Sequence, residues 1–86
     1  MLYLGGFYMK LQKKEISSKI GIRIRKIRTN KKLSIESVAN TAEMEYKQLS
    51  RIELGEINTT IFQIYKLSIA LDTNITEIIS AVYEDI

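Results

Sequence analysis

Apolar residues recur at helical spacing in five segments of the chain, and polar residues separate these segments. The first segment carries four isoleucines at i, i+4, i+8 and i+11, which form one apolar stripe among lysines and arginines: Ile16, Ile20, Ile24 and Ile27. This stripe predicts a helix over roughly residues 17–30. The sequence has no proline and only four glycines, so we expect short turns between helices.

The pattern over residues 33–55 predicts two short helices that are joined by a tight turn. Ser34 is expected to be the N-cap of a helix over residues 35–42. The next helix is expected over residues 45–54, and Gly55 stands where a left-handed C-terminal residue is preferred. This arrangement is a helix-turn-helix, whose second helix enters the major groove in DNA-binding proteins.

Two further helices are predicted near the C-terminus. Thr60 with Gln63 forms a potential capping box for a fourth helix, and Asn74 with Glu77 forms a similar one for a fifth. The fold class is therefore predicted to be all-α, a compact five-helix bundle. We expect residues 15–86 to form this domain and residues 1–14 to form an arm.

Charge is distributed unequally along the chain. Residues 1–32 contain ten of the thirteen lysines and arginines and one acidic residue, whereas the remainder contains three basic and nine acidic residues. A basic first third indicates an anionic partner, most commonly a nucleic acid. The alternative interpretation is a solvated helix face with a flexible tail.

Composition excludes several kinds of chemistry. The chain has no cysteine and no histidine, which removes disulfides, thiolate metal sites and the commonest general base. It has no stretch of ~18 apolar residues, and residues 1–9 lack a basic leader, so neither a membrane span nor a signal peptide is expected. We expect no enzymatic activity, no cofactor and no metal, and a cytoplasmic location.

The outer face of the third helix carries the candidate base-reading residues. Its inner positions, Leu49 and Ile52, are expected to pack against the preceding helix. The opposite face then presents two pairs at i, i+4 spacing: Tyr46 with Ser50, and Lys47 with Arg51. Arg51 is suited to bidentate contact with guanine. Alternatively, Arg51 pairs with a neighbouring acid, Lys47 is solvated and Tyr46 packs on the helix flank.

Four segments in this order resemble the XRE-type helix-turn-helix family, which includes Cro and phage-repressor-like proteins. The resemblance spans about residues 18–80 and rests on Ile20-Gly21-x-Arg23-Ile24-Arg25-x-Ile27-Arg28, Leu33-Ser34-x-Glu36-x-Val38-Ala39, Leu49-Ser50-Arg51-Ile52-Glu53-x-Gly55 and Leu67-x-x-Ala70-Leu71. It implies sequence-specific binding of double-stranded DNA by a small transcriptional regulator, a repressor by expectation.

The resemblance also implies roles for individual residues. Base reading would fall on the four residues of the third helix named above. Phosphate contacts would fall on a helix start, a loop and a basic arm that also includes Lys10: Ser34, Asn58, Thr59, Thr60, Lys13 and Lys14. A structural ion pair would join Arg28 to Glu53. The alternatives are that Ser34 serves only as an N-cap and that the lysine arm has no role.

Three residues depart from the family pattern. Ile35 stands where a polar phosphate contact is usual, and Glu43 stands where the turn usually has glycine, which predicts strain of about 1 kcal/mol or more. Glu45 occupies the expected N-cap of the third helix. A carboxylate there repels phosphates unless it accepts a hydrogen bond from cytosine N4.

Apolar residues on the fourth and fifth helices predict a homodimer. The expected interface consists of Phe62, Tyr65, Ile69, Val82 and Tyr83. Alternatively, these residues cover an extended core beneath the N-terminal segment. A different functional hypothesis is a protein-interaction or antitoxin-like module on the same fold, with a protein partner at the acidic residues.

Overall fold

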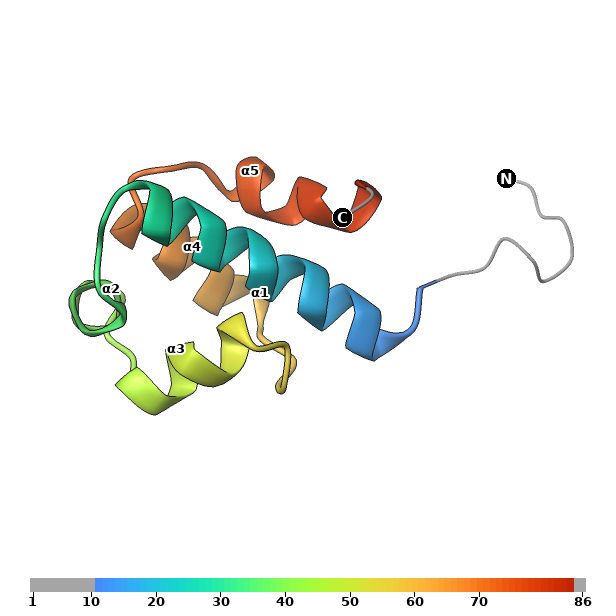
Figure 1. Ribbon diagram of the computed structural model, residues 1–86, viewed down its shortest axis with the longest axis horizontal. Helices are drawn as coiled ribbons and strands as arrows, with labels where there is room; N and C mark the ends of the chain where they lie inside the picture. Colours follow the sequence, from blue (N-terminus) through green and yellow to red (C-terminus); the bar gives the residue numbers. More distant parts are fainter. Residues whose placement is uncertain (1–10, 85–86) are drawn as a thin grey trace, which may run out of the picture.

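The computed structural model describes residues 11–84, and these residues form five α-helices followed by a 3-10 turn (Figure 1). The elements are α1 (Lys13–Asn30), α2 (Ile35–Thr41), α3 (Tyr46–Glu53), α4 (Ile61–Ala70), α5 (Ile75–Ile79) and η2 (Ser80–Tyr83). The predicted all-α bundle is confirmed. The expectations for residues 1–10, including Lys10 in an arm, lie outside the described part.

Helix α1 begins earlier than the apolar stripe predicted. The Glu15 carboxylate accepts a hydrogen bond from the Gln12 backbone N–H at 2.7 Å, which stabilises a first turn at Lys13. The negative charge of Glu15 also suits the N-terminal end of the helix dipole. Lys13 and Lys14, which were expected in the arm, both lie in this first turn.

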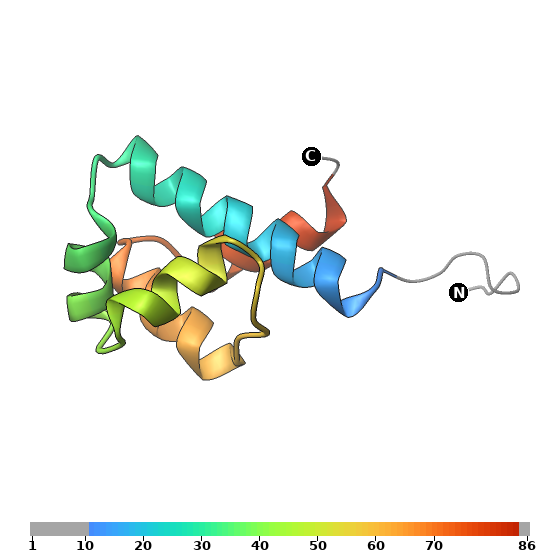
Figure 2. The same ribbon diagram turned by 60° about the horizontal axis from the view of Figure 1, so that its bottom comes forward.

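Helix α1 lies between two other parts of the bundle. Helix α3 packs against one side of α1, and α5 with η2 packs against the other (Figures 1 and 2). Helix α4 contacts α2 and α5. The core contains fully buried side chains from several of these helices: Ile24, Leu49, Leu67, Leu71 and Ile78. Every predicted apolar stripe thus contributes to one core.

Gly21 allows α1 and α3 to approach closely. A Cβ atom at this position would lie 2.2 Å from the backbone oxygen of Ile52 and 2.8 Å from that of Glu53. Both obstacles are backbone atoms, so no side-chain movement relieves the overlap. Glycine at position 21 therefore fixes how deeply α3 is set against α1.

Two left-handed residues shape the helix-turn-helix. Glu43, in the turn between α2 and α3, has φ 57°, as its position in the sequence predicted. Gly55, after α3, has φ 73°, and a Cβ atom there would lie 2.8 Å from the Ser18 Cα atom. Gly55 is thus required both for its backbone conformation and for its contact with α1.

The predicted N-caps of α4 and α5 are present. Thr60 Oγ1 accepts from the Gln63 N–H at 3.1 Å, and Asn74 Oδ1 accepts from the Glu77 N–H at 2.8 Å. The reciprocal half of the box at Thr60 is absent, because the Gln63 Oε1 atom is buried without a hydrogen-bond partner in the described structure. Helix α5 ends at Ile79 and the chain continues from Ser80 as a 3-10 turn, so Val82 and Tyr83, which were expected on the fifth helix, lie in that turn.

Basic side chains of α1 hold the C-terminal elements in place. Arg23 donates to the Glu77 carbonyl oxygen and forms an ion pair with Glu84, and Lys19 donates to the Glu84 carbonyl oxygen. Lys31, the C-cap that follows α1, donates to the Leu71 carbonyl oxygen at 2.7 Å. Part of the positive charge of α1 is therefore used within the fold.

Among the helices of residues 11–84, none combines the length and the apolar character that a membrane span requires.

Candidate nucleic-acid interface

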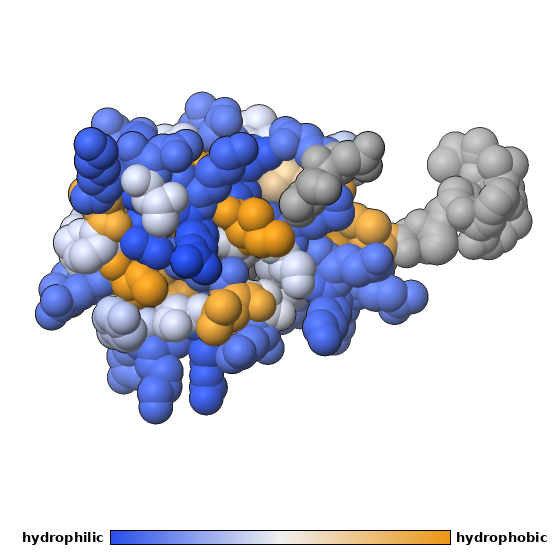
Figure 3. Space-filling model, in the orientation of Figure 1, coloured by the Kyte–Doolittle hydropathy of each residue, from blue (hydrophilic) through white to orange (hydrophobic). Residues whose placement is uncertain are grey.

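The outer face of α3 is polar and accessible. Lys47 and Arg51 are exposed, Ser50 is half-buried, and 58% of Tyr46 is exposed. The inner face of the same helix buries Leu49 completely. Figure 3 shows hydrophilic side chains projecting from the edge of the molecule along which α3 runs. The four candidate base-reading residues thus lie on one helix that is anchored from behind.

A buried ion pair fixes α3 to α1. Arg28 donates from Nε to Glu53 Oε2 at 2.6 Å and from Nη2 to Glu53 Oε1 at 2.9 Å. Its Nη1 atom donates to the Leu33 carbonyl oxygen at 2.8 Å, which ties the segment before α2 to the same group. This bidentate geometry restricts how α3 can rotate about its own axis.

The charge of Arg28 is retained throughout the ordinary pH range. The hydrogen bond to Glu53 raises the pKa of Arg28 above its usual value, against a smaller lowering by burial, and the charges of Glu53 and Tyr46 add to the rise. A raised folded-state pKa means that the contribution of the Arg28 charge to stability is lost only in strongly alkaline solution.

The N-terminus of α2 presents Ser34 to solvent. Its Oγ atom accepts from the Ser37 backbone N–H at 3.0 Å, which is the predicted N-cap, and its hydroxyl hydrogen remains available to an anion. Ile35 packs against the core instead of pointing outward. At position 35 the polar phosphate contact expected from the family pattern is therefore replaced by a packing contact with the core.

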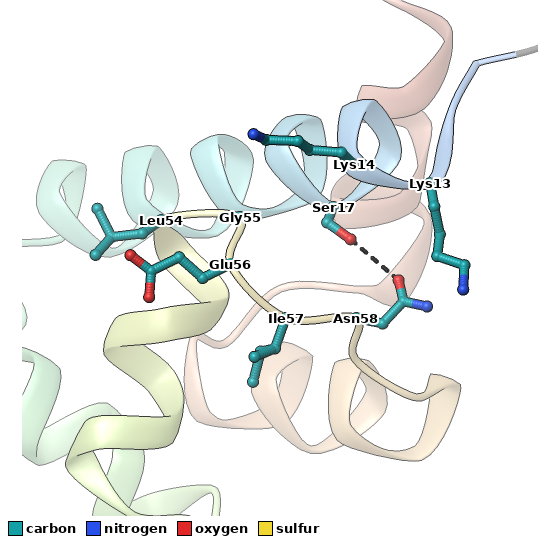
Figure 4. Close-up of a pocket in the computed structure, with 8 residues that line it drawn as sticks. All are labelled: Lys13, Lys14, Ser17, Leu54, Gly55, Glu56, Ile57 and Asn58. Carbon is teal, nitrogen blue, oxygen red and sulfur yellow. Dashed lines mark hydrogen bonds between the residues drawn. The ribbon is translucent and has the colours of Figure 1, made fainter.

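The loop between α3 and α4 lies beside the first turns of α1 and forms an open groove of about 610 Å³. The groove is lined by Lys13, Lys14, Ser17, Leu54, Gly55, Glu56, Ile57 and Asn58 (Figure 4). The Ser17 hydroxyl donates to Asn58 Oδ1 at 3.0 Å, so the Asn58 amide hydrogens are left to donate elsewhere. In Figure 4, Lys13 extends on the same side as Asn58, whereas Lys14 runs along α1.

One expected phosphate contact does not lie at the surface. The Thr59 Oγ1 atom is buried and has no hydrogen-bond partner within the described residues, because its side chain turns inward from the loop. Thr60 is exposed, but its Oγ1 atom already accepts the capping hydrogen bond. The groove thus gathers Lys13, Lys14 and Asn58 as accessible polar groups, and the hydroxyl of Thr59 is removed from the candidate site.

A second exposed surface lies on α4 and is apolar. Between 51% and 64% of each of Phe62, Tyr65 and Ile69 is exposed. Lys66 lies over the Phe62 ring, with its Nζ atom 5.2 Å from the ring centre. Ile61, which the sequence analysis did not include, is equally exposed at the start of the same helix. Phe62, Tyr65 and Ile69 were expected at an interface, and their spacing at i, i+3 and i+7 places them on one side of α4.

The expected apolar surface is only partly continued on the C-terminal turn. Tyr83 is 89% exposed, whereas Val82 is partly buried and packs against the core. The 3-10 turn directs the Val82 side chain toward the core, so Val82 is less accessible than Tyr83. Within residues 11–84, no three histidine, cysteine, aspartate or glutamate side chains come together to hold a metal.

Residues 24–78 match the family model described as Helix-turn-helix (HTH_3). The chain belongs to the HTH_3 helix-turn-helix family. A crystal structure of the restriction-modification controller protein C.AhdI from Aeromonas hydrophila is similar, with 34% identity and a TM-score of 0.71 over 72% of this chain and 94% of that chain. No curated protein matches the chain.

Two more distant structures share the fold. An HTH_3 family transcriptional regulator from Vibrio cholerae has 22% identity and a TM-score of 0.76 over 80% of this chain and 39% of that chain. The clp gene regulator ClgR from C. glutamicum has 16% identity and a TM-score of 0.75 over 79% of this chain and 88% of that chain. These two likenesses concern the arrangement of the helices.

Proposed function

We propose that this protein is a DNA-binding transcription regulator that places α3 in the major groove of double-stranded DNA. The observation that carries the proposal is the polar outer face of α3, held by the Arg28–Glu53 ion pair and the close contact at Gly21. A helix that is anchored from behind and carries accessible donors along its outer face meets the geometric requirement for reading base edges. Membership of the HTH_3 family supports the same conclusion.

Each residue of α3 has a proposed role. Arg51 donates two hydrogen bonds to guanine O6 and N7, a contact that contributes about 1–3 kcal/mol of discrimination. Lys47 donates to a neighbouring base or phosphate. Tyr46 and Ser50 lie on the same face and contact bases or sugars beside them.

The DNA backbone is held on either side of α3. Ser34 and the backbone N–H groups at the start of α2 contact a phosphate on one side. The groove residues Lys13, Lys14 and Asn58, with the start of α4 at Thr60, contact phosphates on the other. These contacts position α3 without reading sequence.

The regulator acts as a homodimer in this proposal. The α4 surface of Phe62, Tyr65 and Ile69, with Tyr83 on the C-terminal turn, is the surface of self-association. A two-fold dimer reads two half-sites about 34 Å apart, one turn of DNA. Occupation of such a site near a promoter represses transcription by excluding other proteins.

Fluorescence anisotropy tests DNA binding. Labelled duplexes, including the DNA upstream of the gene, are titrated at 50 and 200 mM salt. We expect submicromolar binding to some duplexes and a loss of tenfold or more, on the order expected for released counterions, at the higher salt. Arg51→Ala should reduce discrimination between duplexes by about fivefold to 150-fold, and Lys47→Ala should weaken binding.

Lys26→Ala is the matched control, because Lys26 is exposed on α1 beside Glu77 and Glu84, away from α3. It removes the same charge as Lys47→Ala and should change affinity much less. Equal binding to all duplexes, together with no effect of Arg51→Ala, would contradict the proposal.

A second candidate function is a protein-interaction module of the antitoxin-like kind. The observation that favours it is the presence of three exposed carboxylates close to α3, at Glu43, Glu45 and Glu56, which oppose binding to a polyanion. Absence of DNA binding at 50 mM salt, with a stable stoichiometric complex containing a basic protein partner, would support this alternative.

A further inference from the structure

The N-cap of α3 differs from the N-caps of α2, α4 and α5 in what its side chain does. Ser34, Thr60 and Asn74 each use a side-chain oxygen to accept a backbone N–H of the helix that follows. Glu45 has the same extended N-cap backbone, with φ −77° and ψ 149°, but its side chain makes no capping hydrogen bond. The carboxylate of Glu45 is therefore not occupied in holding its own helix.

The Glu45 carboxylate is also without an ion pair among residues 11–84. The two ion pairs in this part of the chain join Arg23 to Glu84 and Arg28 to Glu53. Glu45 is exposed and immediately precedes Tyr46, the first residue of α3. An unpaired negative charge thus stands at the end of α3 that approaches DNA first in the proposed binding mode.

The chemistry of a carboxylate limits which bases it can contact. An ionised carboxylate only accepts hydrogen bonds. In the major groove, guanine offers two acceptors and thymine offers an acceptor and a methyl group, so neither suits it. Adenine places its N7 acceptor beside its amino group, whereas cytosine presents the N4 amino donor alone. Cytosine is therefore the base that a carboxylate at this position selects.

We propose that Glu45 is a specificity-determining residue that accepts a hydrogen bond from cytosine N4 in each half-site. This inference rests on the proposed insertion of α3 into the major groove. It gives the carboxylate a favourable contact where it otherwise only repels phosphates. Glu45 then selects against guanine and thymine by repulsion as much as it selects for cytosine by attraction.

The position of the cytosine follows from the length of α3. Glu45 and Arg51 are six residues apart, which is about 9 Å along a helix at ~1.5 Å per residue. Base pairs are stacked at ~3.4 Å. When α3 lies along the groove, the cytosine read by Glu45 falls about two to three base pairs from the guanine read by Arg51.

Selection of binding sites from randomised duplexes tests the inference, with wild type, Glu45→Gln and Glu45→Ala compared. We expect the wild type to select cytosine at one position of each half-site. Glu45→Gln should shift that position toward adenine, because glutamine pairs with adenine N6 and N7. Glu45→Ala should remove the preference there, a loss of about fivefold to 150-fold in discrimination, and leave the other positions unchanged.

Glu77→Gln is the matched control, since Glu77 is an exposed carboxylate of α5, on the other side of α1 from α3. It should retain the wild-type cytosine preference. If Glu45→Ala raises affinity for all sequences and leaves the selected site unchanged, Glu45 only repels DNA and the inference is overturned. If the wild type selects no sequence, the proposed function fails as well, so the two failures are distinguishable.

Discussion

Helices α3 and α4 are both amphipathic, and they differ in what they present to solvent. The inner faces follow one rule, since α3 buries Leu49 and Ile52 and α4 buries Ile64 and Leu67. The outer face of α3 carries lysine and arginine, whereas that of α4 carries phenylalanine, tyrosine and isoleucine. The apolar inner faces therefore determine how the helices pack, whereas the composition of each outer face depends on what that face contacts.

The polar face suits a hydrated polyanion, and the apolar face suits a second protein surface. Exposing Phe62, Tyr65 and Ile69 to water brings no benefit to an isolated domain, because burying apolar area stabilises by roughly 25 cal/mol per Å². The proposed functions therefore divide between the two helices, with DNA binding on α3 and self-association on α4.

The largest effect is expected from Gly21→Val, which should disrupt the packing that presents the outer faces of both α3 and α4. Its side chain would overlap the Ile52 backbone oxygen, so α3 cannot sit against α1. We expect a cost above about 4 kcal/mol, comparable to the whole stability of a small domain, and loss of cooperative thermal unfolding by circular dichroism. The neighbouring control Ile22→Ala, at a side chain 45% exposed, should unfold close to the wild type.

Glu53→Gln should loosen α3 while leaving α4 in place. The substitution leaves the buried guanidinium of Arg28 without its carboxylate, and breaking a buried pair costs about 3–5 kcal/mol. Urea unfolding measures the loss, and amide exchange should accelerate most in α3. The double variant Arg28→Met/Glu53→Leu removes both charges and should lose less stability than Glu53→Gln. An equal or greater loss of stability would show that the ion pair is not the main contribution of these two residues to folding.

The double variant Phe62→Glu/Tyr65→Glu should break the function of α4 alone. Two carboxylates on a buried self-association surface are expected to weaken dimerisation by about 2 kcal/mol or more, roughly 30-fold, without changing the fold. Sedimentation velocity at tens of micromolar measures this effect. Ile22→Glu places one charge on an exposed apolar residue of α1 and should leave the dimer intact. A monomeric wild type at these concentrations would contradict the proposed dimer.

The smallest effect is expected from Glu43→Gly, which should stabilise the turn before α3. Glu43 has φ 57°, a conformation that costs a residue with a Cβ atom roughly 1 kcal/mol more than glycine. The melting temperature should rise by about 4–8 °C. Glu43→Ala removes the same charge but keeps the strain, so an equal rise in both variants would attribute the gain to charge.

Sequence patterns predicted the elements that local interactions determine. The N-caps Ser34, Thr60 and Asn74, and the left-handed residues Glu43 and Gly55, depend on neighbours within a few positions. Local chemistry also determines the early start of α1, and the Gln12–Glu15 capping box was the signal that could have identified it.

Features that depend on packing between distant segments were not predictable in this way. The inward turn of Thr59 and of Val82 is decided by the helices that surround them. The contact of Arg23 with Glu84 joins residues that are 61 positions apart, and that of Lys31 with Leu71 joins residues 40 apart. Counting charges along the chain therefore overstated how much of the basic first third is available to DNA.

Titration of the ¹⁵N-labelled protein with a 20-base-pair duplex at low salt, followed by amide chemical shifts, tests the central claim most directly. We expect the largest shifts to fall in α3, at the start of α2 and in the loop before α4, and the exposed face of α4 to be unaffected. Shifts that concentrate at Phe62, Tyr65 and Ile69 while α3 stays unchanged would contradict this claim.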